Sequence, residues 1–265
     1  MLTNYNEILK DQGVVLLKNV VDSDLMKKVR KKYDELDKTI TRTEIEKEKP
    51  IIVLWEHVEG ETKRLTNFEE YPELWELIVN SIIPKLRKKL TKRTKRLQLM
   101  ETIIFNKPAE ISNTLNWHQD VAYFPVKPNS QIAVWIPFEI ATYERGAMNY
   151  AIGSNKLGIR ASTNLHTRAK FENDDRELIP SDPKQSGLDV VCMEMTPDDM
   201  IVHDGYTWHY SGPNTVKDHT RKGLSVRFIT EEAVFDPRPG QGAAFTQQID
   251  IKPGEILKGT AFPLF

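Results

Sequence analysis

The pattern of apolar residues changes at Leu97, and this change constrains the fold more than any other feature of the sequence. From there on, short apolar or alternating segments follow one another, separated by Pro, Gly and Asn. Many short strands at such spacing are typical of a β-sandwich or a β-barrel. The expected strands are residues 97–106, 117–124, 131–140, 146–152, 188–195, 200–209 and 223–230.

The N-terminal third favours helices instead. Asp22 or Ser23 is a suitable cap for a helix whose apolar face comprises Leu25, Val29, Tyr33 and Leu36. A second helix is predicted at residues 72–83, while residues 13–21 and 51–58 have the β-branched, apolar character of strands. We therefore predict an α+β fold in which N-terminal helices pack on a mainly β core.

The 265 residues fit one large domain or two small ones, and we expect a single domain. Its expected parts are a helical N-terminal part at residues 1–96, a β core at 97–232 and a C-terminal extension at 233–265. A polar insert, residues 155–187, interrupts the β series. A long irregular insert of this kind is usually a lid, a binding loop or a disordered segment.

Composition excludes several classes of protein and of site. With 39% hydrophobic and 28% charged residues, the chain is ordinary for a soluble globular protein, and its net charge of -1 gives no overall attraction to nucleic acid or membrane. The single cysteine, Cys192, excludes an intramolecular disulfide and any Cys-based zinc or iron–sulfur site. No apolar run approaches a membrane span, and the first residues lack the features of a signal peptide, so we expect a cytoplasmic protein.

The stretch Asn116-Trp117-His118-Gln119-Asp120 carries the clearest chemical signal. In a strand, residues two apart point to the same face, so the His118 imidazole and the Asp120 carboxylate converge on one point. With a second histidine from elsewhere, they make the facial triad that holds non-heme Fe(II) and leaves positions open. A lone His-x-Asp has a high false-positive risk, and His57-Val58-Glu59 has the same pattern in a charged, turn-like context.

Two downstream residues raise the significance of this stretch. His209 ends the predicted strand 200–209 and precedes the turn signal Tyr-Ser-Gly-Pro-Asn. Arg221 follows His209 by 12 residues, a separation that fits a hairpin returning it beside His209. A guanidinium there suits the far carboxylate of a keto acid. His203 is a rival ligand six residues earlier in the same predicted strand, but we expect it to lie too far along to share the metal.

Several runs of the sequence resemble the phytanoyl-CoA dioxygenase family of Fe(II)/2-oxoglutarate oxygenases. They are GVVLLKNVVDSDLMKKVRKKYDEL, WHQDVAYFPVKP, GAMNYAIGSNK, WHYSGPN and RKGLS, in an order that covers the chain from about Tyr5 to Thr230. The resemblance implies a double-stranded β-helix, also called a jelly roll or cupin-like barrel. Ile152-Gly153-Ser154-Asn155 departs from the Pro-Gly-Ser-His common in the family, which weakens any assignment of phytanoyl-CoA itself as substrate.

The resemblance also implies roles for individual residues. The metal ligands and catalytic centre fall on His118, Asp120 and His209. The 2-oxoglutarate site falls on Arg221, Ser211 and Trp135. Asn116, on the strand face of His118, is a further candidate contact for 2-oxoglutarate or substrate, whereas Gln119 should face away from the metal.

The implied cofactors are Fe(II), 2-oxoglutarate as cosubstrate, and O2. The expected reaction is hydroxylation of a small-molecule, acyl or natural-product substrate, either free or tethered to CoA or a carrier, with release of succinate and CO2. A carboxylate at Asp120 argues against halogenation, since related halogenases have a small residue there. Epimerisation, desaturation and peroxide formation stay open, as does the oligomeric state.

Two other classes stay open as well: a non-catalytic metal-binding barrel such as a ligand sensor, and a metal-dependent hydrolase on the same fold. The basic run at residues 85–96 also has two interpretations. It is either the solvated face of a helix that buries Leu86 and Leu90, or a docking patch for an anionic partner such as a CoA phosphate or an acidic carrier protein.

Overall fold

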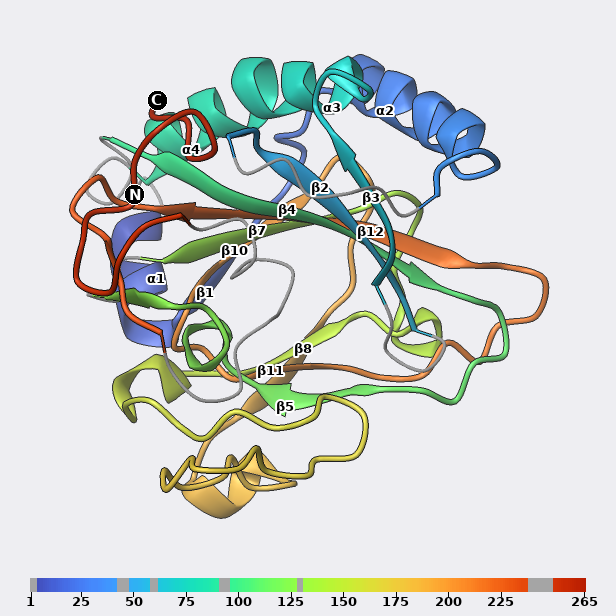
Figure 1. The fold of residues 1–265 in the computed structure, drawn as a ribbon. Coiled ribbons are helices and arrows are strands. Elements are labelled where there is room, and N and C mark those ends of the chain that lie inside the picture. The colour runs from blue at the N-terminus through green and yellow to red at the C-terminus, as the bar shows by residue number, and fades with distance from the viewer. Residues whose placement is uncertain (1–3, 42–47, 58–61, 91–95, 128–130, 238–249) are drawn as a thin grey trace.

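Two facing β-sheets, one of them covered by helices, make up the fold in a computed structural model that describes residues 4–41, 48–57, 62–90, 96–127, 131–237 and 250–265 (Figure 1). The larger sheet has the order β1 (Val14–Leu17), β10 (Met200–Asp204), β7 (Ile132–Pro137), β12 (Arg221–Ile229), β4 (Gln98–Lys107), β2 (Ile51–Glu56) and β3 (Thr62–Asn67). The smaller sheet has the order β5 (Leu115–His118), β11 (His209–Ser211), β8 (Met148–Ala151) and β9 (Val190–Met193). A third, two-stranded sheet pairs β13 (Val234–Phe235) with β6 (Val126–Lys127). The predicted jelly-roll class is confirmed.

Helices cover the outer face of the larger sheet (Figure 1). They are α2 (Ser23–Leu36) and a continuous helical segment made of α3 (Pro72–Leu77), the π-helical turn Ile78–Ile82 and α4 (Ile83–Lys89), while α1 (Tyr5–Gln12) lies beside β1. Asp22 caps α2 as predicted, because its Oδ1 accepts the N–H groups of Asp24 and Leu25 at 3.0 Å each. No helix in the described part of the chain combines the length and apolar character that a membrane crossing requires.

The alternation of strand side chains divides β12 between two environments. Leu224, Val226 and Phe228 belong to the main apolar core, which also contains Val29 of α2. The residues that alternate with these face the smaller sheet. They are Arg221, Gly223, Ser225 and Arg227. One strand therefore supplies both the core under the helices and polar groups to the space between the sheets.

Two predicted strands are wrong in their extent. The predicted strand 117–124 ends at His118, and Asp120–Ala122 form a 3₁₀ helix. The predicted strand 200–209 is two strands, β10 and β11, in different sheets. A turn separates them because Asp204 accepts the Tyr206 N–H through Oδ1 at 2.9 Å and the Thr207 N–H through its carbonyl at 2.9 Å. The chain thus crosses from one sheet to the other just before His209.

The polar insert, residues 155–187, runs along the edge of β5. Asn116 donates its backbone N–H to Leu165 O at 2.8 Å and its side-chain amide to Leu165 O and His166 O at 3.0 and 2.9 Å. The Gln119 amide donates to Gly158 O at 3.2 Å. The insert is therefore fastened on both sides of His118, and its role as a lid stays a prediction.

Other predicted segments have mixed outcomes. Leu86, Leu90 and Leu97 are buried, but α4 ends at Lys89 and residues 91–95 lie outside the described residues, so both interpretations of the basic run stay predictions. The N-terminal third contributes β1, β2 and β3 to the larger sheet. In the C-terminal extension, Leu257 and Phe262 pack with Met100 and Ile229. The division into one domain with these boundaries stays a prediction.

Gly223 of β12 provides a test of the packing between the sheets. A Cβ atom at this position would lie 2.6 Å from Cζ2 of Trp135, so we expect Gly223→Ala to displace the indole and to lower the free energy of unfolding by about 1–3 kcal/mol. Urea denaturation measures the change. Gly212→Ala is the control, because its Cβ would meet only Tyr210, at 3.6 Å. Equal stability of the two variants would contradict the predicted clash.

Candidate metal centre

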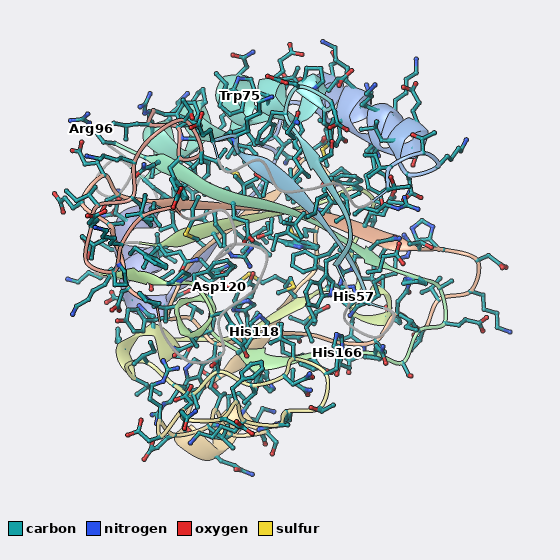
Figure 2. All side chains as sticks on the ribbon, viewed as in Figure 1. His57, Trp75, Arg96, His118, Asp120 and His166 are labelled. Atoms are coloured by element: carbon teal, nitrogen blue, oxygen red, sulfur yellow. The ribbon has the colours of Figure 1, made fainter. Side chains whose placement is uncertain are left out.

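His118 and Asp120 lie close together in Figure 2, and His209 joins them in one group of potential metal ligands. His118 ends β5 and lies opposite His209, the first residue of β11, and their ring centroids are 4.1 Å apart. Asp120 begins the 3₁₀ helix after β5, and its Oδ1 lies 3.7 Å from His209 Nε2. One potential ligand atom from each residue lies within 4.8 Å of the others. Gln119, between the two, is extended with φ -129° and ψ 139°, so Asp120 follows His118 onto the same face, as alternation predicts, and the 3₁₀ helix begins only at Asp120.

Both histidines present the same ring nitrogen to the centre. Nδ1 of His118 lies 2.7 Å from Asn116 O and Nδ1 of His209 lies 2.9 Å from Thr207 O. A carbonyl can only accept, so each Nδ1 carries the proton and each Nε2 offers its lone pair. This is how protein groups usually orient metal-binding imidazoles.

Burial and charge set the protonation states. Burial lowers the pKa of His118, and burial together with the neighbouring His118 and His203 lowers the pKa of His209 well below its usual value. Burial alone would raise the pKa of Asp120, but Arg227, His203 and His209 together hold it well below its usual value. At neutral pH the group is two neutral nitrogens and one carboxylate, a donor set that suits a divalent transition metal.

Arg227 holds the carboxylate of Asp120 from the larger sheet. Its Nη2 lies 3.1 Å from Asp120 Oδ1, its Nε 3.2 Å from Oδ2, and its Nη1 3.3 Å from Glu101 Oε2. All three side chains are buried. Arg227 and Glu101 were not predicted as part of the site. In the sequence, each is only a single charged residue inside an apolar strand.

His203 also reaches this group, contrary to its predicted position. Its Nε2 lies 3.3 Å from Asp120 Oδ2 and its ring centroid 4.6 Å from that of His209. The prediction assumed one strand from 200 to 209, whereas β10 and β11 lie in opposite sheets and bring the two rings together. Within the described residues, the potential metal-binding group comprises His118, Asp120 and His209, and His203 contacts the carboxylate.

A second polar site surrounds Ser211, the last residue of β11, and includes Arg221, the first residue of β12. Arg221 Nη2 donates to Ser211 Oγ at 2.8 Å and to Gly146 O at 3.1 Å. Lys107, opposite Arg221 in the sheet register, donates through Nζ to the same Oγ at 2.9 Å and to Gly212 O. The guanidinium carbon lies 5.6 Å from the centroid of the Trp135 ring. Lys107 was not predicted as part of this site. The sequence shows it only as a basic residue at the end of an apolar strand, where β4 ends.

Among the described residues, no carboxylate forms a salt bridge with either basic group of this site, and Glu139 acts on Arg221 only at longer range. Arg221 is 2% exposed and Lys107 is fully buried. Burial lowers the pKa of Arg221 to about 10, and burial together with Arg221 lowers the pKa of Lys107 well below its usual value. Buried cations are costly unless an anion accompanies them, so this site is suited to a carboxylate ligand.

Other sequence candidates have structural contacts of their own. Asn116 uses its amide on the insert, so its role in binding 2-oxoglutarate stays a prediction. His57 is fully buried at the end of β2, where Nδ1 lies 3.1 Å from Asn106 O; Val58 and Glu59 lie outside the described residues. His166 of the insert stacks on Trp55 with ring centroids 6.4 Å apart. Figure 2 shows His57 and His166 together, to one side of His118 and Asp120.

Comparison with known proteins gives a family, a relative and a set of similar folds. Residues 9–223 match the phytanoyl-CoA dioxygenase (PhyH) family. The phytanoyl-CoA dioxygenase domain-containing protein 1 homolog of Dictyostelium discoideum is 28% identical over 127 residues, which are 46% of this chain. The match spans 43% of that relative's length.

Solved structures with a similar fold include two proteins described as non-heme and alpha ketoglutarate dependent. SnoK, an alpha ketoglutarate dependent carbocyclase from nogalamycin biosynthesis, superposes with a TM-score of 0.72 at 21% identity, over 99% of this chain and 96% of its own. The epimerase SnoN, solved with Fe3+, alpha ketoglutarate and nogalamycin RO, gives 0.67 at 18% identity over 98% and 96%. EvdO2 from Micromonospora carbonacea var. aurantiaca, complexed with 2-oxoglutarate, gives 0.60 at 19% identity over 90% and 95%. The fold is thus shared with these enzymes, and the match of residues 9–223 shows that the chain belongs to the phytanoyl-CoA dioxygenase family.

Proposed function

We propose that this protein is a non-heme Fe(II)- and 2-oxoglutarate-dependent dioxygenase that hydroxylates a small-molecule, acyl or natural-product substrate. One observation carries the proposal: the His-Asp-His group adjoins two buried basic side chains that share Ser211, because His209 and Ser211 lie two residues apart on β11 and so face the same side. A metal site alone would also suit a sensor or a hydrolase. The adjoining pair of unneutralised cations is what a dicarboxylate cosubstrate requires.

His118, Asp120 and His209 are the residues that would hold iron. Their two Nε2 lone pairs and one carboxylate form the facial donor set that leaves positions open on Fe(II). The SnoN structure with Fe3+ and alpha ketoglutarate supports this choice of metal and cosubstrate for the fold. When bound, iron and 2-oxoglutarate supply dioxygen activation, with succinate and CO2 as the products that accompany the oxidised substrate.

Arg221, Lys107 and Ser211 would bind the far carboxylate of 2-oxoglutarate. The guanidinium donates through Nε to Arg145 O at 3.4 Å and through Nη2 to Gly146 O and Ser211 Oγ, so a carboxylate would meet it through Nη1. The amino group of Lys107 adds a second donor at the same Ser211 hydroxyl, and Trp135 lies against Arg221. Ser211 orients both cations through one hydroxyl, which itself donates to Gly146 O at 3.0 Å.

The type of oxidation and the substrate belong to the same proposal. Asp120 occupies a ligand position with a carboxylate, which favours hydroxylation over halide transfer. Structurally similar proteins include a carbocyclase and an epimerase. Identification of the reaction product would therefore distinguish hydroxylation from ring formation and epimerisation. Arg96, at the end of the basic run, lies far from His118 and Asp120 in Figure 2, so a CoA- or carrier-tethered substrate would be docked there at a distance from the chemistry.

The site predicts an optical signal. Anaerobic addition of Fe(II) and then 2-oxoglutarate to the wild-type protein should produce the weak visible charge-transfer band of a chelated keto acid. His209→Ala should abolish it, because one of three ligands is lost. His219→Ala is the matched control, since that histidine lies outside the His-Asp-His group, and it should keep the band. Bound iron without a band in the wild type would redirect the assignment to a sensor or a hydrolase.

The cation pair predicts a separation of cosubstrate binding from metal binding. Arg221→Leu and Lys107→Met should each weaken 2-oxoglutarate binding by about 10- to 100-fold, the value of a lost charge-assisted hydrogen bond, and should leave metal affinity unchanged. Calorimetric titration of the anaerobic Mn(II) protein measures both constants. Lys222→Met serves as control, because Lys222 pairs with Asp34 at 2.9 Å on the helical side of β12. Wild-type 2-oxoglutarate affinity in Arg221→Leu would refute the assignment of this pocket.

A further inference from the structure

The two carboxylate oxygens of Asp120 differ in how many contacts they already make. Oδ2 accepts from Arg227 Nε at 3.2 Å and lies 3.3 Å from His203 Nε2. Oδ1 accepts from Arg227 Nη2 at 3.1 Å and faces His209 Nε2 at 3.7 Å. A carboxylate offers about four lone-pair sites, two on each oxygen. Oδ2 therefore has both of its sites in use, while Oδ1 retains one.

The contact from His203 is a donated hydrogen bond, because the carboxylate of Asp120 can only accept from Nε2. On the other side of the ring, Nδ1 lies 3.2 Å from the hydroxyl of Tyr150. Tyr150 and His203 form a chain of hydrogen bonds that ends at Oδ2.

Arg227 is itself fixed from two further sides. Glu101, its partner in the register of β4 and β12, lies 3.3 Å from Nη1. The guanidinium carbon lies 4.5 Å from the centroid of the Phe124 ring. With both neighbours buried, the fork has little freedom to swing away from Asp120.

The geometry points to Arg227 and His203 as positioning residues that restrict Asp120 to a single metal contact, through Oδ1. This inference rests on the proposed function. Three protein ligand atoms leave three of six positions on an octahedral ion, as a chelating cosubstrate and dioxygen together require. A second oxygen from Asp120 would occupy one of them. The hydrogen bonds at Oδ2 prevent that second contact, so they set the number of open positions.

Counting exchangeable waters on Mn(II) tests the inference without turnover. In the wild type, water proton relaxation should report about three coordinated waters, and about one after 2-oxoglutarate is added. Arg227→Met frees both oxygens, so the count should fall by about one third without the cosubstrate and to near zero with it. Metal affinity should not fall, because a competing positive charge has been removed from beside Asp120.

Two further variants make the result decisive. His203→Phe removes only the second donor to Oδ2 and should lower the water count in the same direction, which also covers the case in which Arg227→Met does not fold. Lys222→Met, which removes a positive charge from the helical side of the same strand, should match the wild type.

The outcomes separate this inference from the proposed function. If the wild-type water count does not change on addition of 2-oxoglutarate, the proposed function itself fails. If it changes, and both variants bind Mn(II) with wild-type counts, the positioning role is overturned. Loss of metal affinity and stability in the variants, at an unchanged count per bound ion, would show an ordinary structural role and would also overturn it.

Discussion

The pairing of Arg227 with Asp120 is the interaction on which the rest of the centre depends. It joins the larger sheet to the segment that follows β5 of the smaller one, through two contacts of 3.1 and 3.2 Å between buried groups. A charge buried without a partner costs far more than the pair gains, so loss of either residue destabilises the fold by about 3–5 kcal/mol unless another charge, such as a metal ion at Asp120, compensates. This ion pair links the two sheets at the centre, beside an apolar cluster in which Trp135 and Ile201 of the larger sheet pack with Met148 and Tyr150 of the smaller one.

Strand alternation makes this arrangement possible. In β12, Leu224 and Val226 lie in the core under the helices, and the residues between them face the smaller sheet. The same strand therefore delivers Arg221 to one end of the site and Arg227 to the other. The helical layer stabilises the strand from outside, which leaves its inner face available for charged groups that contribute to chemistry.

Much of this architecture was predictable from local pattern. The β series after Leu97, the capped helix at Asp22 and the residues of the His-Asp-His group all follow from short-range features or from the family resemblance. Arg227, Glu101 and Lys107 did not, because each is a lone charge in a strand and its partner comes from a distant part of the chain. His203 was misplaced for a related reason: the sequence does not mark the point at which one apolar run leaves one sheet and enters the other.

The insert along β5 has a consequence for how this protein can diverge. Asn116 and Gln119 lie on either side of His118, and their side-chain amides donate hydrogen bonds to backbone carbonyls of the insert. The Asn116 amide donates to Leu165 and His166, and the Gln119 amide donates to Gly158. A change in the path of the insert therefore alters the backbone on both sides of His118. Replacement of the insert would leave this histidine in place only if the new segment offered Asn116 and Gln119 carbonyl partners at the same positions.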